Sequence, residues 1–195
     1  MSRSRICKRI RETKETRIEI ELNIDEAGEI YVETPIKFFN HLLSTLLSYM
    51  NSTAMVKAIN KESYDDHHVV EDCGITLGEA FNECLGNRVG IKRFADILIP
   101  MDDALILLSI DISGRGRAYI DLNINREFIG DVATENIYHF IESFAYRSAV
   151  TIHIIQLKGF NSHHIVEAVF KGLGITLYEA SRIVDSRIRS TKGIL

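Results

Sequence analysis

Two adjacent histidines, followed three residues later by a glutamate, occur twice in this chain of 195 residues. The first copy is His67-His68-Val69-Val70-Glu71, and the second, 96 positions further on, is His163-His164-Ile165-Val166-Glu167. His41 and His139 precede the two copies, so six of the seven histidines belong to one repeated pattern. Imidazole and carboxylate together are ligands for zinc, manganese, iron or nickel. The pattern therefore predicts metal binding, and the absence of cysteine at these positions argues against a structural thiolate zinc site.

Each histidine doublet is predicted to begin a helix. Asp65 and Asp66 precede the first doublet, Asn161 and Ser162 precede the second, and all four are residue types suited to a helix N-cap. On a helix the glutamate lies one turn from either histidine and can share an ion with it. Adjacent side chains project about 100° apart, so each doublet is expected to serve two ions. The alternative to metal binding is that each histidine only begins a helix and is hydrogen-bonded to backbone or solvent. That role would not require the pattern to recur in register in the second half.

The elements that carry these residues are duplicated as well. Apolar residues follow each doublet at helical steps of three and four, and the two sets lie 96 positions apart: Val70, Cys73, Leu77, Phe81 and Cys84 in the first, and Val166, Val169, Leu173, Leu177 and Ala180 in the second. An earlier helix, from Ile36 to about Met50, carries His41, and its counterpart from about Thr134 to Ala149 carries His139. These correspondences predict an internal repeat.

Alternating apolar and polar residues predict strands between the helices. Thr16–Ile24 is followed by a short return strand, Glu29–Glu33, and Thr53–Ile59 lies between the two helices of the first half. In the second half, Ala104–Ile112 and Arg117–Ile124 are predicted as a hairpin, and Thr151–Leu157 corresponds to Thr53–Ile59. The repeated unit is therefore interpreted as ββαβα.

We expect an α+β fold with an internal pseudo-two-fold repeat. Four helices would pack between two mostly antiparallel or mixed four-stranded sheets, because each amphipathic helix must bury one face. Residues 1–195 would form a single catalytic domain of two repeated halves, about 1–92 and about 93–195. Ligands drawn from both halves could also require sites shared between subunits of a symmetric oligomer.

Composition excludes several classes of function. The chain is 46% hydrophobic and 26% charged, and its net charge of −4 offers no basic field for nucleic acid. No apolar run reaches the length of a membrane span, and Met1–Arg11 lacks the apolar segment of a signal peptide. Cys7, Cys73 and Cys84 form an odd set without a motif, and we expect reduced thiols in a cytoplasmic protein.

Three segments resemble the imidazoleglycerol-phosphate dehydratase family: Phe38-Phe39-Asn40-His41-Leu42-Leu43, Asp65–Asp72 and Asn161–Ala168. The similarity covers essentially the whole chain, including Ser113-Gly114-Arg115 and Ser190-Thr191-Lys192-Gly193. Enzymes of this family are hydro-lyases of histidine biosynthesis that convert D-erythro-imidazole glycerol phosphate to imidazole acetol phosphate and water. The resemblance implies the same monofunctional activity here.

The resemblance also implies a manganese enzyme with two Mn²⁺ ions per active site. The residues that match the metal-binding positions are His41, His67, His68, Glu71, His139, His163, His164 and Glu167. Which ligand belongs to which ion is left open. The family implies a cytoplasmic homo-oligomer of 24 subunits built from trimers, with active sites at the subunit interfaces.

Substrate contacts are implied at both ends of the chain. The residues that match positions binding the substrate phosphate and its surroundings are Arg93, Arg115, Ser190 and Lys192, and Glu15 matches a glutamate that reaches the substrate. We group Lys171, Thr191 and Thr45 with them as candidates. The family usually has Asp-Gln where this chain has Ser44-Thr45, and the shorter threonine hydroxyl reaches less far than the glutamine.

The elimination requires a carboxylate to accept a proton from C2 of the substrate, which no carbonyl acidifies. The imidazole ring supplies an electron sink, and ions at its two nitrogens would act as Lewis acids. Glu167, Glu71 and Glu15 are the candidate catalytic residues, with Glu167 favoured.

Two other functions compete with this hypothesis. Asp66-His67-His68 also spells the Asp-His-His of dinuclear metal phosphoesterases, although those enzymes need further aspartates near the amino end and only Asp25, in a turn, is available here. A non-catalytic metal-binding shell protein is the third interpretation.

Overall fold

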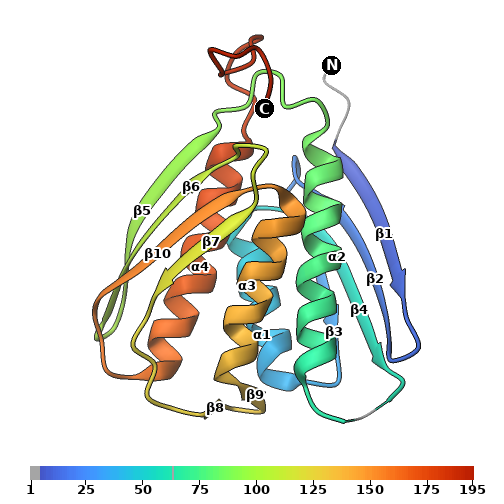
Figure 1. The fold of residues 1–195 in the computed structure, drawn as a ribbon, viewed down its shortest axis with the longest axis vertical. Coiled ribbons are helices and arrows are strands. Elements are labelled where there is room, and N and C mark those ends of the chain that lie inside the picture. Colours follow the sequence, from blue (N-terminus) through green and yellow to red (C-terminus); the bar gives the residue numbers. More distant parts are fainter. Residues whose placement is uncertain (1–4, 63) are drawn as a thin grey trace.

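A computed structural model of the chain describes residues 5–62 and 64–195, and it places four helices between two four-stranded sheets (Figure 1). The first half contains β1 (Ile6–Glu12), β2 (Thr16–Asn23), β3 (Ile30–Glu33), α1 (Lys37–Tyr49), β4 (Thr53–Asn60) and α2 (His67–Leu85). The second half contains β5 (Phe94–Met101), β6 (Ala104–Asp111), β7 (Arg117–Asp121), β8 (Phe128–Ile129), β9 (Val132–Ala133), α3 (Thr134–Ser148), β10 (Thr151–Lys158) and α4 (Ser162–Ser181).

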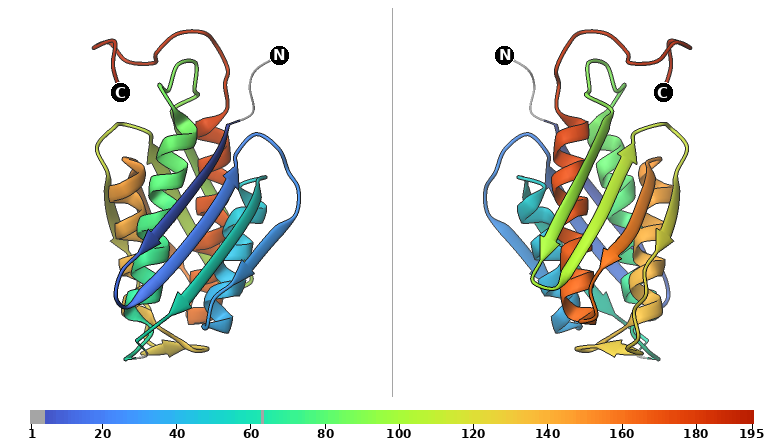
Figure 2. Two further views of the ribbon diagram at one scale, coloured as in Figure 1. Left: turned by 90° about the vertical axis from the view of Figure 1, so that its right-hand side faces the viewer. Right: turned by 90° about the vertical axis from the view of Figure 1, so that its left-hand side faces the viewer.

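The two sheets have the same topology, which confirms the predicted duplication. Their strand orders are β1-β2-β4-β3 and β5-β6-β10-β7, each with three antiparallel strands and one strand, β3 or β7, that pairs in parallel. Helix α2 covers β1 and β2, and α4 covers β5 and β6 (Figure 2). The closest helix pairs, α2 with α3 and α1 with α4, each join one half to the other.

Several predicted strand details were wrong. The repeated unit is not ββαβα, because a further strand, β1 or β5, begins each half and was not predicted. Charged residues occupy both faces of β1, as Lys8 and Arg9 do, so the strand lacks a clear alternation of apolar and polar residues. β3 and β7 are not hairpin returns, because each lies at the edge of its sheet beyond β4 or β10. Each pairs in parallel with that strand, and α1 or α3 forms the crossover between the two. β7 also ends at Asp121, and a small β8–β9 hairpin follows.

All four helices run in the same direction, with their N-termini at the lower end of Figure 1. Helices α1 and α3 follow β3 and β7, and α2 and α4 follow β4 and β10, which run parallel to those strands. All four helices therefore return in the same direction. The C-terminal tail lies beyond the opposite end of the helices (Figure 2). None of the described helices is both long and apolar enough to cross a membrane.

The predicted apolar stripes of α2 and α4 are buried in the core, as expected from their spacing. Glycines allow the helices to approach closely. A Cβ added to Gly74 on α2 would lie 2.7 Å from the carbonyl oxygen of Phe140 on α3, and one added to Gly174 on α4 would overlap the carbonyl oxygen of Leu46 on α1. Small residues at these two positions therefore set the separation of the helices.

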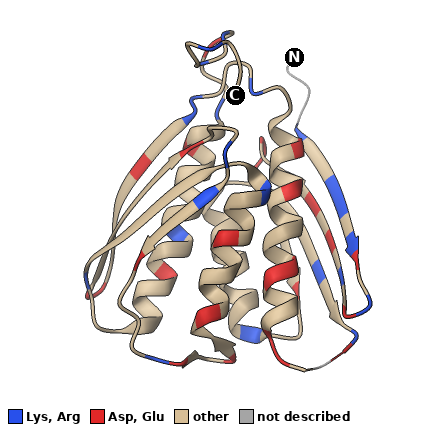
Figure 3. Ribbon diagram, viewed as in Figure 1, with Lys and Arg blue, Asp and Glu red and all other residues tan. Residues whose placement is uncertain are grey.

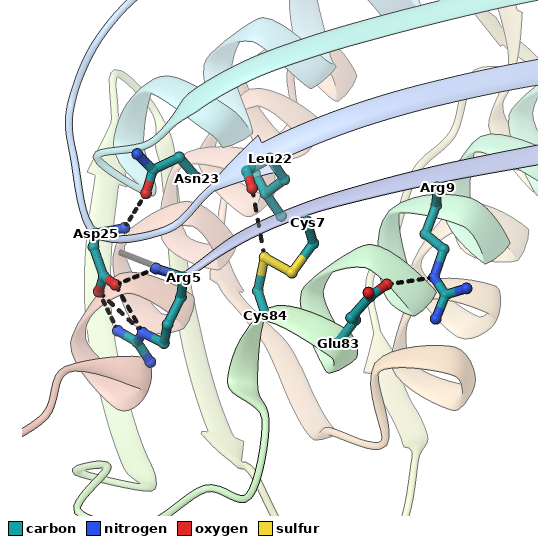
Figure 4. The surroundings of a disulfide bond; sticks show 8 residues. All are labelled: Arg5, Cys7, Arg9, Leu22, Asn23, Asp25, Glu83 and Cys84. Atoms are coloured by element: carbon teal, nitrogen blue, oxygen red, sulfur yellow. Dashed lines mark hydrogen bonds and ion pairs between the residues drawn. A yellow bond between two sulfur atoms is a disulfide. The ribbon is translucent and has the colours of Figure 1, made fainter. Parts of the chain in front are cut away.

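The expectation of three reduced thiols was wrong for two of the cysteines. A disulfide joins Cys7 on β1 to Cys84 on the last turn of α2, with a Cα–Cα distance of 5.6 Å (Figure 4). The pairing was hidden because β1, which brings Cys7 to the core side of its sheet, was not recognised. Cys73 is free, and its complete burial raises the pKa of its thiol far above the usual value.

The glycine contacts predict that Gly174→Ala destabilises the fold by about 1 to 3 kcal/mol, because the new methyl group meets rigid backbone of α1. Urea unfolding monitored by circular dichroism measures this loss. The matched control is Gly172→Ala on the same helix, where the nearest atom is a side-chain methyl of Ile99 at 3.3 Å. A Gly174→Ala variant as stable as the Gly172→Ala variant would contradict close packing at this point.

Candidate active site at the helix N-termini

A first cluster of candidate metal ligands joins α1 and α4. One ligand atom from each of His41, His163 and Glu167 lies within 4.8 Å of the other two. His163 Nε2 is 3.1 Å and His41 Nε2 is 3.8 Å from the same carboxylate oxygen, Oε2 of Glu167. His41 belongs to the first half of the chain and the other two to the second, so neither half forms the cluster alone.

Glu167 is held by a lysine one turn further along α4. The Nζ atom of Lys171 lies 2.8 Å from Oε1 of Glu167, whose side chain is only 12% exposed. Burial opposes ionisation of this carboxyl group, but the hydrogen bond and charge of Lys171, with contributions from His41 and His163, outweigh it. The pKa of Glu167 is therefore below its ordinary value, and the side chain is a carboxylate at neutral pH.

A second, more open cluster joins α2 and α3 in the pseudo-symmetric position. His67 Nε2 lies 3.6 Å from Glu71 Oε2, and the rings of His67 and His139 are 5.0 Å apart between centroids. The buried Asn136, one turn before His139, places its Oδ1 atom 2.9 Å from His67 Nδ1. That contact directs Nε2 of His67 toward Glu71.

The second histidine of each doublet faces away from these clusters. His68 Nδ1 lies 3.3 Å from a carboxylate oxygen of Glu15 in the β1–β2 turn. His164 Nδ1 lies 2.6 Å from Oδ1 of Asp103 in the β5–β6 turn. The two rings of each doublet therefore have different partners, as their divergence on a helix requires.

Side chains hold the helix starts that carry these residues. Asn161 Oδ1 accepts the backbone N–H of His163, and Asp65 Oδ1 accepts that of His67 at the equivalent position of the first copy. Asp66 does not cap α2 with its side chain; its Oδ2 instead accepts the N–H of Ala133 next to α3. The bond between Asp66 and Ala133 joins the start of α2 to the residue before α3, at the end of the helices where the candidate ligands lie.

The candidate phosphate-binding residues gather at the opposite end of the molecule. Arg93 forms a bidentate pair with Asp111, at 2.7 and 3.1 Å, and donates at 2.5 Å to the carbonyl of Arg189 in the tail. A cleft of about 530 Å³ is lined by Arg93 and residues of the tail that include Ser190 and Thr191. Figure 3 shows Lys and Arg residues along this part of the chain.

Arg115 and Lys192 belong to the same end. Arg115 begins the approach to β7, and its backbone N–H donates to Ser113 Oγ. The neighbouring Gly114 lies against the chain terminus at Leu195, so the tail reaches the Arg115 turn. The backbone N–H of Lys192 donates to Ser190 Oγ. Within one chain, these residues and the histidine clusters therefore lie at opposite ends of the helices (Figure 1).

Two other candidates lie along the helices. Thr45 is buried on α1, and Lys171 is engaged by Glu167 on α4. Neither is brought to the tail.

Comparison with known proteins identifies the family. A family model described as imidazoleglycerol-phosphate dehydratase matches residues 34–177. The chain belongs to the imidazoleglycerol-phosphate dehydratase family. As a dehydratase of this family, it is a hydro-lyase of histidine biosynthesis.

Dehydratases from other organisms match almost end to end. The enzyme of Sulfolobus acidocaldarius is 59% identical and that of Saccharolobus solfataricus 62% identical, each over 98% of this chain and 100% of the relative. Among solved structures, the Pyrococcus furiosus dehydratase in complex with (S)-C348 has a TM-score of 0.84 and 38% identity, covering 96% of this chain and 100% of the other. The Staphylococcus aureus dehydratase has a TM-score of 0.80 and 27% identity, covering 93% and 99%.

Sequence reasoning missed two polar residues at the ligand end of this dehydratase. Asn136 and Asp103 each contact a ring nitrogen of a doublet histidine. Asn136 had a signal, because it lies one helical turn before His139 on the same predicted helix. Asp103 had none, because its turn follows β5, a strand that was not predicted.

The contact with Lys171 predicts that Lys171→Met raises the pKa of Glu167 in the metal-free dehydratase. The carboxylate loses its hydrogen bond and nearest positive charge, so its protonated form should persist to higher pH. The ¹³C carboxyl resonance of Glu167, followed through a pH titration, measures the change. Lys171→Arg keeps the charge and should titrate close to the wild-type protein. An unchanged titration in Lys171→Met would exclude this account.

Proposed function

We propose that this dehydratase converts D-erythro-imidazole glycerol phosphate to imidazole acetol phosphate with two Mn²⁺ ions in each active site. The donor set supports the proposal, because imidazole nitrogens and carboxylate oxygens without thiolates suit a divalent ion such as manganese. Ligands bound about 2 Å from one ion lie within about 4 Å of each other, and the Nε2 atoms of His163 and His41 lie 3.1 and 3.8 Å from Oε2 of Glu167.

The observation that carries the proposal is the division of eight candidate ligands into two clusters and two outward-facing histidines. His41, His163 and Glu167 would hold one ion, and the pseudo-symmetric set would hold the other: His67, Glu71 and His139. His68 and His164 face the surface beside turns. We propose that they complete ions held by neighbouring copies of the chain.

A shared site would also account for the distance between the two ends of the molecule. The tail with Ser190, Thr191 and Lys192, together with Arg93 and Arg115, lies far from the clusters of its own chain (Figure 1). In an oligomer of 24 subunits built from trimers, the arginine end of one copy can meet the histidine end of another. Arginine and lysine would then bind the substrate phosphate through charge-assisted hydrogen bonds.

The chain's own carboxylates would move the proton. When bound, the ions would act as Lewis acids toward the imidazole ring of the substrate. Glu167 is the favoured acceptor of the C2 proton, because its carboxylate is the least exposed of the three candidates and lies within the first cluster. Glu71 and Glu15 are the remaining candidates, and both are more exposed than Glu167. Glu15, in the β1–β2 turn, would reach the substrate at the edge of the site.

The phosphoesterase alternative is not favoured. Its Asp-His-His sequence requires Asp66 as a ligand, but one carboxylate oxygen of Asp66 accepts the backbone N–H of Ala133. The location proposed for the enzyme remains the cytoplasm. This now depends on its place in histidine biosynthesis, since the Cys7–Cys84 disulfide removes the argument from reduced thiols.

Removing divalent ions tests the proposal directly. Dialysis against a chelator should abolish dehydration of imidazole glycerol phosphate, and added Mn²⁺ should restore it, because the clusters without ions offer no Lewis acid. Turnover is followed by the appearance of imidazole acetol phosphate, and bound metal by elemental analysis. Full activity in protein proved free of divalent ions would refute metal dependence.

Glu167→Gln should retain binding of inorganic phosphate while reducing kcat by at least about 100-fold, the lower range for loss of a general base. The amide keeps the shape of the side chain but cannot accept the proton. Glu179→Gln, on the last turns of the same helix and paired with Lys92, is the matched control and should keep wild-type turnover. Near-normal kcat in Glu167→Gln would exclude Glu167 as the base.

A further inference from the structure

Asp103 makes three polar contacts from one carboxylate. Its Oδ2 atom accepts the backbone N–H groups of Phe160, at 2.7 Å, and Asn161, at 3.1 Å. Its Oδ1 atom lies 2.6 Å from Nδ1 of His164. The carboxylate thus joins the β5–β6 turn to the loop that begins α4 and to the second ring of the doublet.

The two backbone contacts fix the direction of the third. With Oδ2 occupied by N–H donors, Oδ1 is held toward the imidazole ring. An ionised carboxylate only accepts hydrogen bonds, so Nδ1 of His164 must be the donor. The backbone of the same segment is fixed by the Asn161 cap on the N–H of His163. Both the position and the tautomer of the His164 ring are therefore determined by surrounding bonds.

From this geometry we infer that Asp103 is a positioning residue, which keeps the proton of His164 on Nδ1 and turns Nε2 toward the protein surface, where its nearest carboxylate is that of the exposed Asp102, at 3.4 Å. The inference rests on the proposed function, in which His164 is a ligand of an ion shared with a neighbouring copy. Hydrogen bonding of one ring nitrogen to a carboxylate is a general way to orient a metal-binding histidine. Asp103 would act through His164, since its carboxylate bonds to that ring and to two backbone N–H groups.

The equivalent contact in the first half is looser, which distinguishes the roles of the two turns. Glu15 lies 3.3 Å from His68 Nδ1, and within the described residues its carboxylate has no backbone N–H bond of the kind that fixes Asp103. Glu15 is also 41% exposed at its side chain, against 19% for Asp103. Glu15 can turn toward a substrate, whereas Asp103 is committed to His164.

The tautomer can be measured in metal-free protein. Histidine labelled with ¹⁵N gives separate resonances for protonated and bare ring nitrogens, and His164→Gln assigns the signal. Magic-angle-spinning spectra recorded at alkaline pH should show the neutral His164 ring protonated at Nδ1. Protonation at Nε2 in the wild-type protein would overturn the inference.

Asp103→Asn provides a stringent variant. If its oxygen keeps the two backbone N–H groups, its NH₂ group faces Nδ1 of His164 and donates, which moves the ring proton to Nε2. We expect this reversal in the spectrum and about 10- to 100-fold weaker Mn²⁺ binding at one of the two sites, measured by paramagnetic resonance of free Mn²⁺. A wild-type tautomer with unchanged Mn²⁺ affinity would contradict the positioning role.

Asp102→Asn is the charge-matched control. Asp102 lies 3.4 Å from His164 Nε2, but its side chain is 68% exposed, and it should not set the tautomer. An equal loss of Mn²⁺ affinity in this variant, with the tautomer intact, would assign the effect to charge alone and overturn the inference. The spectra of metal-free protein do not depend on metal binding, so a wild-type protein that binds no Mn²⁺ would refute the proposed function without affecting the tautomer.

Discussion

The parallel direction of the four helices is the constraint on which the site depends. Each helix N-terminus carries partial positive charge from unsatisfied N–H groups, and four of them lie at one end of the molecule (Figure 1). Carboxylates are stabilised there. Asp65 and Asp131 accept N–H groups of the first residues of α2 and α1, and Asp103 accepts those of the two residues just before α4. The same end collects Glu71 and Glu167. A dense set of acidic groups is therefore compatible with this end and would be destabilised at the other.

The duplication supplies matching ligands, but the two copies have diverged in how their turns are held. In the first half Asp72, one residue after Glu71, is buried and accepts bonds from Arg11 Nε, at 2.7 Å, and from the hydroxyl of Thr16. The helix thus fixes the β1–β2 turn that carries Glu15. In the second copy the equivalent residue is Ala168, and the turn residue Asp103 fixes the helix start instead.

Much of the fold could be predicted from periodicity, and the limits have physical causes. Stripes such as Val70 to Cys84 are regular because helices bury one face, and their recurrence after 96 positions revealed the repeat. The edge strand β1 was missed because solvent and ion pairs with Glu19, Glu21 and Glu83 satisfy its charged residues on both faces. Parallel pairing of β3 depends on a crossover that local sequence does not specify.

The candidate ligands could also be predicted from their spacing in the sequence, but their division between two clusters could not. Adjacent positions in a helix imply that the two rings diverge, but only the structure shows that His163 lies beside His41 and His67 beside His139. Contacts between distant segments, such as Cys7 with Cys84 or Asp103 with His164, leave no periodic trace in the sequence. They involve single residues in turns or strand ends, where pattern carries little information.

The arginine tail and the histidine end lie at opposite poles of one chain (Figure 2). Under the proposed assembly, a copy with a substitution at one end still contributes an intact binding surface from its other end. Mixing inactive copies altered at Arg93 with inactive copies altered at His163 would then create some interfaces with both surfaces intact. Two null alleles of this gene could thus complement each other in one cell, a genetic property that a self-contained active site would not have.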